Sequence, residues 1–229
     1  MRNFIMPKRI CTFLMLALLC ASSWAQQSNI ISGVSPKLKK FISNYPEAAK
    51  IFTNAISDAF SNKTVRLYYF YSNDESEVRY LHYYPNTVGL PEVALCIREN
   101  QCPLDEFIGI LYETINSKNE SAFTKLSQEA YLGTISKEQF SKHILQYEFE
   151  AGTSTRAALL TLKLRKAETD ESDFYHSFTE CPTNFDDFLP FCKKVYPQWR
   201  GDKDYEIKYD SLRKMYSDFN SASNSPVKN

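Results

Sequence analysis

In the first half of the chain, the apolar positions change from a helical period to a strand-like period. Residues 36–44 and 46–61 carry apolar side chains at helical spacing, and Pro46 fits the first turn of the second segment. Three later segments are rich in β-branched and aromatic residues, which predicts strands over 64–72, 77–84 and 92–98. Because a short polar turn separates the first two strands, they are predicted to pair as an antiparallel hairpin.

The second half of the chain returns to helical spacing. Prolines, a capping-box pattern beginning at Ser136 and a helix-ending Gly133 mark the helix boundaries. An acidic stretch, 167–172, is predicted to be a loop. The order of helices, strands and helices predicts an α+β fold in which a small antiparallel sheet of about three strands packs with several helices. The predicted helices of this half are 103–117, 120–132, 136–165 and 205–219.

Residues 1–25 have the organisation of an export signal. Arg2, Lys8 and Arg9 precede a short apolar run, and a small-x-small motif predicts cleavage after Ala25. The protein is therefore expected to be secreted or periplasmic, and the alternative is a lipoprotein cleaved before Cys20. The mature chain is expected to comprise a loose segment, a single α+β domain and a disordered tail, over residues 26–35, 36–219 and 220–229.

Charge argues against a nucleic-acid partner, and hydropathy argues against a transmembrane segment in the mature chain. The signal contains three of the 27 basic residues and none of the 27 acidic ones, so 24 basic residues remain against 27 acidic ones, a net charge of about −3. A nucleic-acid-binding face needs a basic excess, so no nucleic-acid partner is expected. No second long apolar run follows the signal, so no transmembrane segment is expected in the mature chain.

Four cysteines remain after the signal is removed. An even number in an exported chain favours disulfides. Three pairings are open, and the preferred one joins Cys96 to Cys102 and Cys181 to Cys192, because each bridge closes a short loop. Free or metal-bound thiols are the alternative, although no C-x2-C zinc knuckle is present.

Two short motifs carry the candidate chemistry. The first is Tyr112-Glu113-x-x-Asn116, and the second is Glu148-x-x-Ala151-Gly152. The first resembles the HExxH helix of zinc peptidases, in which two histidines one helical turn apart bind zinc and the glutamate activates water. The second is similar to the Glu-x-x-Ala-Asp pattern of gluzincin metallopeptidases. A small sheet, the HExxH helix and a later glutamate-bearing helix are the layout of that family.

The resemblance implies a role for each matched residue. Glu148 would occupy the position of the third zinc ligand, Glu113 that of the general base, and Tyr112 and Asn116 those of the two histidines. A neutral phenol and an amide are poor zinc ligands, so no metal or other cofactor is expected and Glu113 is left without activated water. The resemblance therefore implies an inactivated peptidase that binds an unknown peptide or protein.

Other interpretations of the same residues stay open. Glu113 and Glu148 could form a rearranged metal site with His143, which would make the protein an active metal-dependent hydrolase. Tyr112 and Asn116 could instead flank the apolar stripe of an ordinary helix, which would leave a secreted structural or interaction protein. The predicted hairpin could also expose an aromatic binding surface, because its tyrosines fall on both faces of the strands: Tyr68, Tyr69, Tyr71, Tyr80, Tyr83 and Tyr84.

Overall fold

The structure is a computed structural model that describes seven parts of the chain, and most of what it describes is helical. The parts are residues 31–32, 34–59, 64–70, 79–84, 92–98, 102–195 and 201–223. For residues 31–32 and the three segments between 64 and 98 only the backbone is described, and the same holds for residues 221–223. The predicted export signal, 1–25, lies outside these parts.

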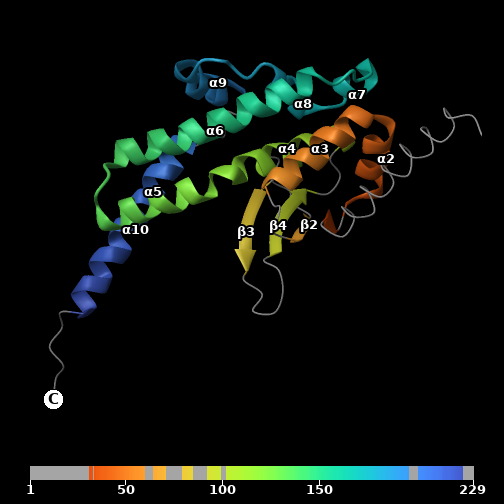
Figure 1. Cartoon of the computed structure of the whole chain (residues 1–229). Coiled ribbons are helices and arrows are strands. Elements are labelled where there is room, and N and C mark those ends of the chain that lie inside the picture. The colour runs from red at the N-terminus through yellow and green to blue at the C-terminus, as the bar shows by residue number, and fades with distance from the viewer. Residues whose placement is uncertain are drawn as a thin grey trace, which may run out of the picture.

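The predicted α+β class is wrong. The part of the chain whose side chains are described is 86% helical and contains no strand. The strands are confined to backbone-only segments: β1 (Ile31–Ser32), β2 (Thr64–Phe70), β3 (Arg79–Tyr84) and β4 (Glu92–Arg98). They lie beneath the helices in Figure 1. The helices of the second half, rather than the strands, form most of the described structure.

The predicted hairpin is also wrong, and so is the all-antiparallel sheet. The strand order is β1-β2-β4-β3, so β2 and β3 do not pair with each other. β2 is parallel to both β1 and β4, with Val65 opposite Val93, and only β3 and β4 are antiparallel. A polar turn between two strands favours a reversal of the chain but does not select the pairing partner. Here β4, which comes later in the sequence, pairs with both β2 and β3.

Two helices between β1 and β2 in the sequence cover one side of the central helix. α2 (Pro36–Asn44) begins at Ser35, whose hydroxyl accepts a hydrogen bond from the Leu38 amide at 3.0 Å. α3 (Pro46–Ala59) follows after one residue. Both helices were expected at nearly these bounds, because proline starts and regular apolar spacing are strong local signals. Their apolar faces pack on the next helix, α4 (Pro103–Asn116).

α4 is the helix around which the others pack. It contacts α2, α3, α6, α8 and β4, and most of its residues between Leu104 and Leu111 are buried. A helix that is apolar on nearly all sides must be surrounded by other elements. Two buried acids in its first turn hold neighbours in place. Glu106 accepts a hydrogen bond from the Ser35 hydroxyl at 2.8 Å, and Asp105 accepts hydrogen bonds from the Ser172 hydroxyl and the Phe174 amide.

The long helix α6 (Lys137–Leu160) lies alongside α4 in Figure 1. It starts with the expected capping box, in which Ser136 and Gln139 exchange side-chain and backbone hydrogen bonds. It ends five residues before the predicted limit, and the predicted acidic loop contains a short helix, α7 (Lys166–Asp170). Three further short elements follow: α8 (Asp173–Thr179), a 3₁₀ turn at Phe185–Asp187 and α9 (Phe188–Val195).

The last helix, α10 (Gly201–Ser223), packs against α6 and against α5 (Glu120–Leu132). It reaches three residues beyond Asn220, where the sequence predicts the start of a disordered tail. Two hydrogen bonds fix its position. The Tyr209 hydroxyl donates to the Ile135 carbonyl at 2.9 Å, and the Arg213 guanidinium donates to the Tyr131 carbonyl at 2.7 Å. The Arg213 side chain covers Gly133, whose φ of 76° requires a residue without a side chain.

Two apolar clusters lie along these helices. The first joins α2, α3 and α4 to the end of α6 and is centred on Phe107. The second joins α5, α6 and α10 around Phe140 and Ile144. In the parts of the chain searched, no helix has the length and apolar character needed to cross a membrane.

Candidate functional site

The site is built on two helices that contact each other, α4 and α6. Tyr112 and Asn116 are four residues apart on α4, so they lie one turn apart on the same face of that helix. Glu148 lies in the middle of α6. The structure brings all three residues together, as the two motifs require.

The Glu148 carboxylate is the centre of the cluster. Its Oε2 atom accepts a hydrogen bond from the Tyr112 hydroxyl, and its Oε1 atom accepts one from the Asn116 amide at 3.3 Å. The side chains at the two histidine positions of the motif therefore bind the carboxylate at the third-ligand position directly. Hydrogen bonds occupy the place where the resemblance implies a metal ion.

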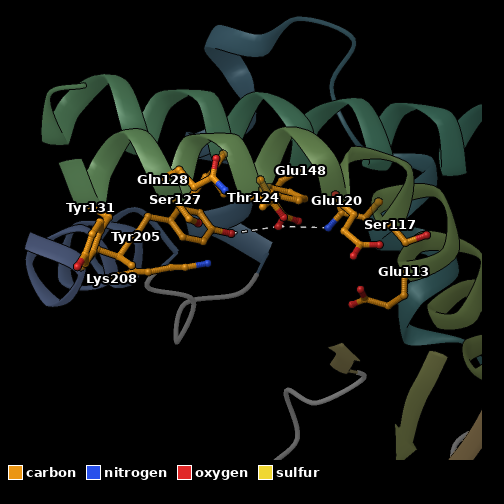
Figure 2. Close-up of a pocket in the computed structure, with 14 residues that line it drawn as sticks. Glu113, Ser117, Glu120, Thr124, Ser127, Gln128, Tyr131, Glu148, Tyr205 and Lys208 are labelled. Carbon is orange, nitrogen blue, oxygen red and sulfur yellow. Dashed lines mark hydrogen bonds between the residues drawn. The ribbon is translucent and has the colours of Figure 1, made fainter. Parts of the chain in front are cut away.

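A fourth residue, Tyr205 on α10, completes the cluster. Its hydroxyl donates to Oε1 of Glu148 at 3.1 Å, as the dashed line in Figure 2 shows. The sequence predicts only that Tyr205 begins an amphipathic helix. Its spacing from Tyr209 and Leu212 places it on the packed face, but nothing in the sequence identifies which acceptor its hydroxyl meets. The cluster therefore connects three helices, which are separated by long stretches of sequence.

Both phenols in the cluster are kept protonated. Burial raises the pKa of Tyr112 well above its ordinary value, and the negative charges of Glu148 and Glu113 raise it further. Burial and the Glu148 charge likewise raise the pKa of Tyr205. A protonated phenol donates a hydrogen bond to a carboxylate and is a weak metal ligand. The electrostatics of the cluster thus favour hydrogen bonding to Glu148.

Zinc does not fit this set of donors. Glu148 is the only strong zinc ligand of the three positions implied by the resemblance, and its oxygens already accept three hydrogen bonds. The rearranged site with His143 is not assembled either, because His143 is exposed and no cluster of three metal-binding side chains occurs among the residues searched. No step of a reaction can be derived through a metal held by these residues.

Gly152 marks a further departure from the peptidase pattern, which has aspartate there. A Cβ atom at this position would lie 3.2 Å from the Cys181 sulfur and 3.7 Å from the Phe188 ring. The close approach leaves no room for a carboxylate. This part of α6 packs on Cys181 and on Phe188, the first residue of α9.

Beside the cluster lies an open groove with a volume of about 700 Å³. α4 contributes Glu113 and Asn116 to one end, and α10 contributes Tyr205, Lys208 and Leu212 to the other. One face of α5 forms a wall between them, and Phe123 and Ile144 provide apolar surface. Figure 2 shows Glu113 with its carboxylate directed into the open side, well apart from Glu148.

The predicted disulfides are wrong. Among the cysteines whose side chains are described, none lies at disulfide distance, and Cys102, Cys181 and Cys192 are free thiols. Cys102 instead caps α4, where its sulfur accepts a hydrogen bond from the Asp105 amide at 3.4 Å. Cys181 and Cys192 are buried in one apolar cluster with Phe188. The side chain of Cys96 lies outside the described residues. Short sequence separation therefore did not bring the sulfurs of Cys181 and Cys192 into bonding geometry.

Comparison with protein-family models, with curated proteins and with solved structures finds no match for this chain. The interpretation of the site therefore depends on its geometry and its chemistry.

The cluster geometry predicts that the two phenols stabilise the fold through Glu148. Tyr205→Phe and Tyr112→Phe should each lower the free energy of unfolding by about 1.5–3 kcal/mol, because each removes a hydrogen bond to a charged group. In a Glu148→Gln background, each loss should fall below about 1 kcal/mol. Each tyrosine has its own cycle of four proteins: the wild type, the tyrosine variant, Glu148→Gln and the double variant. Urea denaturation of these proteins measures the coupling.

Tyr209→Phe is the matched control, since it removes a hydroxyl from the same helix that bonds the Ile135 carbonyl and not Glu148. Its cost, about 0.5–1.5 kcal/mol, should be the same with and without Glu148→Gln. Additive losses for Tyr112, Tyr205 and Glu148 would contradict the cluster.

The two buried thiols are predicted to be unreactive. Burial raises the pKa of Cys181 to about 11 and that of Cys192 to about 12. In a Cys96→Ser/Cys102→Ser variant at pH 8.5, iodoacetamide should label the folded protein roughly a hundredfold more slowly than the urea-unfolded protein, because thiolate is the reactive form. Peptide mass mapping over time gives both rates. Labelling at similar rates in the two states would contradict the burial of these thiols.

Proposed function

We propose that this protein is an exported, non-catalytic binding domain that resembles an inactivated gluzincin and holds a peptide or protein segment in the groove beside Glu148. One observation carries the proposal. The three residues that the resemblance assigns to the metal site meet in space, and a hydrogen-bonded carboxylate occupies that position next to an open groove.

The groove has the composition expected of a peptide-binding surface. Apolar side chains from α5, α6 and α10 supply contact area, and short polar side chains of α5 supply hydrogen-bonding groups. Asn116 adds one further feature, because its side-chain oxygen is buried and has no hydrogen-bond partner among the described residues. A backbone amide of a bound peptide is a donor of the kind that this oxygen lacks.

The same geometry accounts for the lack of catalysis in the proposal. Peptide hydrolysis by a peptidase of this kind requires an activated water at Glu113. The Tyr112 phenol and the Asn116 amide hydrogen-bond to the Glu148 carboxylate, which would be the third metal ligand in the peptidase. These residues therefore hold no metal ion that could activate a water molecule beside Glu113. Export remains part of the proposal, and its direct readout is a mature N-terminus at Gln26 in the secreted protein.

The proposal predicts that a bulky side chain in the groove abolishes binding. A pool of fluorescein-labelled random nonapeptides, acetylated and amidated at its ends, should raise its anisotropy with the wild-type mature protein. Ser127→Trp should reduce that signal at least tenfold, because Ser127 lines the groove. Ser121→Trp is the matched control on the exposed surface of the same helix and should bind as the wild type does.

The same pool also tests for catalysis, because mass spectrometry of the recovered peptides shows whether they have been cleaved. Intact masses are expected after incubation with or without added zinc. Cleavage that needs zinc and is lost in Glu113→Gln would overturn the non-catalytic proposal in favour of a hydrolase. Equal binding by the wild type and Ser127→Trp would contradict the proposal that the peptide binds in the groove.

A further inference from the structure

No cation of the described residues balances the negative charge of Glu148. Its three hydrogen-bond donors, on Tyr112, Asn116 and Tyr205, are all neutral groups. Within the described parts of the chain, no lysine, arginine or histidine lies within ion-pair distance of its carboxylate. After burial, this charge is the largest cause that raises the pKa of both phenols. Neutral donors therefore hold the carboxylate in place but leave its charge uncompensated.

The Glu148 carboxylate is also accessible from the groove. Glu148 is partly exposed and lines the groove, and Figure 2 shows its carboxylate facing the same open space as that of Glu113. A carboxylate offers about four lone-pair sites to donors. The hydrogen bonds from Asn116 and Tyr205 go to Oε1, and only the one from Tyr112 goes to Oε2. Oε2 can therefore accept one more hydrogen bond, from a ligand.

The rest of the groove lining is also more acidic than basic. Its described residues include the carboxylates of Glu113, Glu120 and Glu148 and the single ammonium of Lys208. Glu113 and Glu120 lie near each other where α4 is followed by α5, whereas Lys208 lies on α10 at the other end. Asn116, which lines the groove beside Glu148, has a buried side-chain oxygen with no hydrogen-bond partner among the described residues. This end of the groove suits a ligand group that is positive and donates hydrogen bonds.

Aromatic and apolar side chains surround these acceptors. The rings of Phe123 and Tyr205 and the aliphatic side chains of Ile144 and Leu212 line the same groove. Arginine matches this combination, because its planar guanidinium carries several N–H donors, stacks on aromatic rings and follows an apolar stem. Among the residues searched, no three metal-binding side chains are grouped together, so the lining suits an organic cation better than a metal ion.

We propose that the groove binds a peptide segment through an arginine side chain whose guanidinium pairs with the Glu148 carboxylate. The guanidinium supplies the positive charge that the three neutral donors lack. Glu113 and Glu120 add to the attraction, and the aliphatic stem of the arginine packs on Ile144. This inference rests on the proposed function, because it names the ligand chemistry of the same groove.

Three pools of acetylated and amidated nonapeptides test the inference, with the central residue fixed as arginine, citrulline or glutamate. Citrulline has nearly the shape of arginine but no charge. The wild-type protein should bind the arginine pool about threefold to tenfold more tightly than the citrulline pool, and the glutamate pool most weakly. Anisotropy titrations measure the affinities, and the advantage of arginine should shrink between low and physiological salt.

Two variants locate the cation. Glu148→Gln should reduce the advantage of arginine over citrulline to less than about twofold, because it removes the charge that the guanidinium pairs with. Glu113→Gln should reduce the advantage in part while it leaves the hydrogen bonds of the Glu148 cluster in place, so it carries the test if Glu148→Gln does not fold. Glu150→Gln is the matched control, because Glu150 is an exposed carboxylate on the same helix that does not line the groove. It should keep the wild-type advantage.

The outcomes separate this inference from the proposed function. Equal affinity of the wild type for the arginine and citrulline pools would overturn the inference and leave the groove function intact. An arginine advantage that survives in full in folded Glu148→Gln and in Glu113→Gln would also overturn it, as would binding that appears only with a free N-terminal amine. Failure of every pool to bind would overturn the proposed function itself.

Discussion

A carboxylate between packed helices needs hydrogen-bond donors. The Glu148 side chain imposes this requirement on the packing of α4, α6 and α10. Its two oxygens accept hydrogen bonds from α4 and from α10 while α6 carries the carboxylate. A half-buried charge without donors is destabilising, so the phenols and the amide help to hold the three helices together. The groove beside the cluster is lined by residues of α4, α5, α6 and α10.

The cluster differs at two positions from the zinc-peptidase pattern that the motifs resemble. Imidazoles at positions 112 and 116 would direct nitrogen lone pairs toward an ion beside Glu148. A phenol and an amide in those places direct N–H and O–H groups toward Glu148 instead. Imidazole nitrogens donate lone pairs to a metal ion, whereas the phenol and the amide donate hydrogen bonds to the carboxylate. Hydrogen bonds hold the helices together here, although these residues do not suit a metal cation. The carboxylate and its donors take over the structural role that the resemblance implies for a metal.

Local signals in the sequence predicted much of the helical structure. Pro36, Pro46, Pro103, Ser136 and Gly133 mark helix ends through backbone chemistry that acts over a few residues, and the observed boundaries agree with them. The convergence of Tyr112, Asn116 and Glu148 was also accessible, because the resemblance supplied a three-dimensional pattern in advance. The role of Tyr205 could not be predicted from the sequence, because its hydrogen bond depends on how α10 packs against α6.

The wrong predictions have the same origin in long-range packing. The pairing of β2 with β4 depends on a third strand that is not adjacent to β2 in sequence, and a local turn signal cannot report it. The cysteines were paired by loop length, whereas the structure turns Cys102 toward the Asp105 amide and packs Cys181 and Cys192 into an apolar cluster. α7 formed where acidic composition predicted a loop. Its first turn is held by Glu168, whose carboxylate accepts hydrogen bonds from the Arg165 backbone amide and guanidinium.

The most direct test of the account is zinc binding by a variant that restores both imidazoles, Tyr112→His/Asn116→His. Titration calorimetry combined with X-ray absorption should detect one zinc ion bound by two nitrogens and a carboxylate, and binding should be lost when Glu148→Gln is added. The wild-type protein should hold no zinc that depends on Glu148. A folded two-histidine variant that fails to bind zinc, or a wild-type protein whose stoichiometric zinc disappears in Glu148→Gln, would contradict the account.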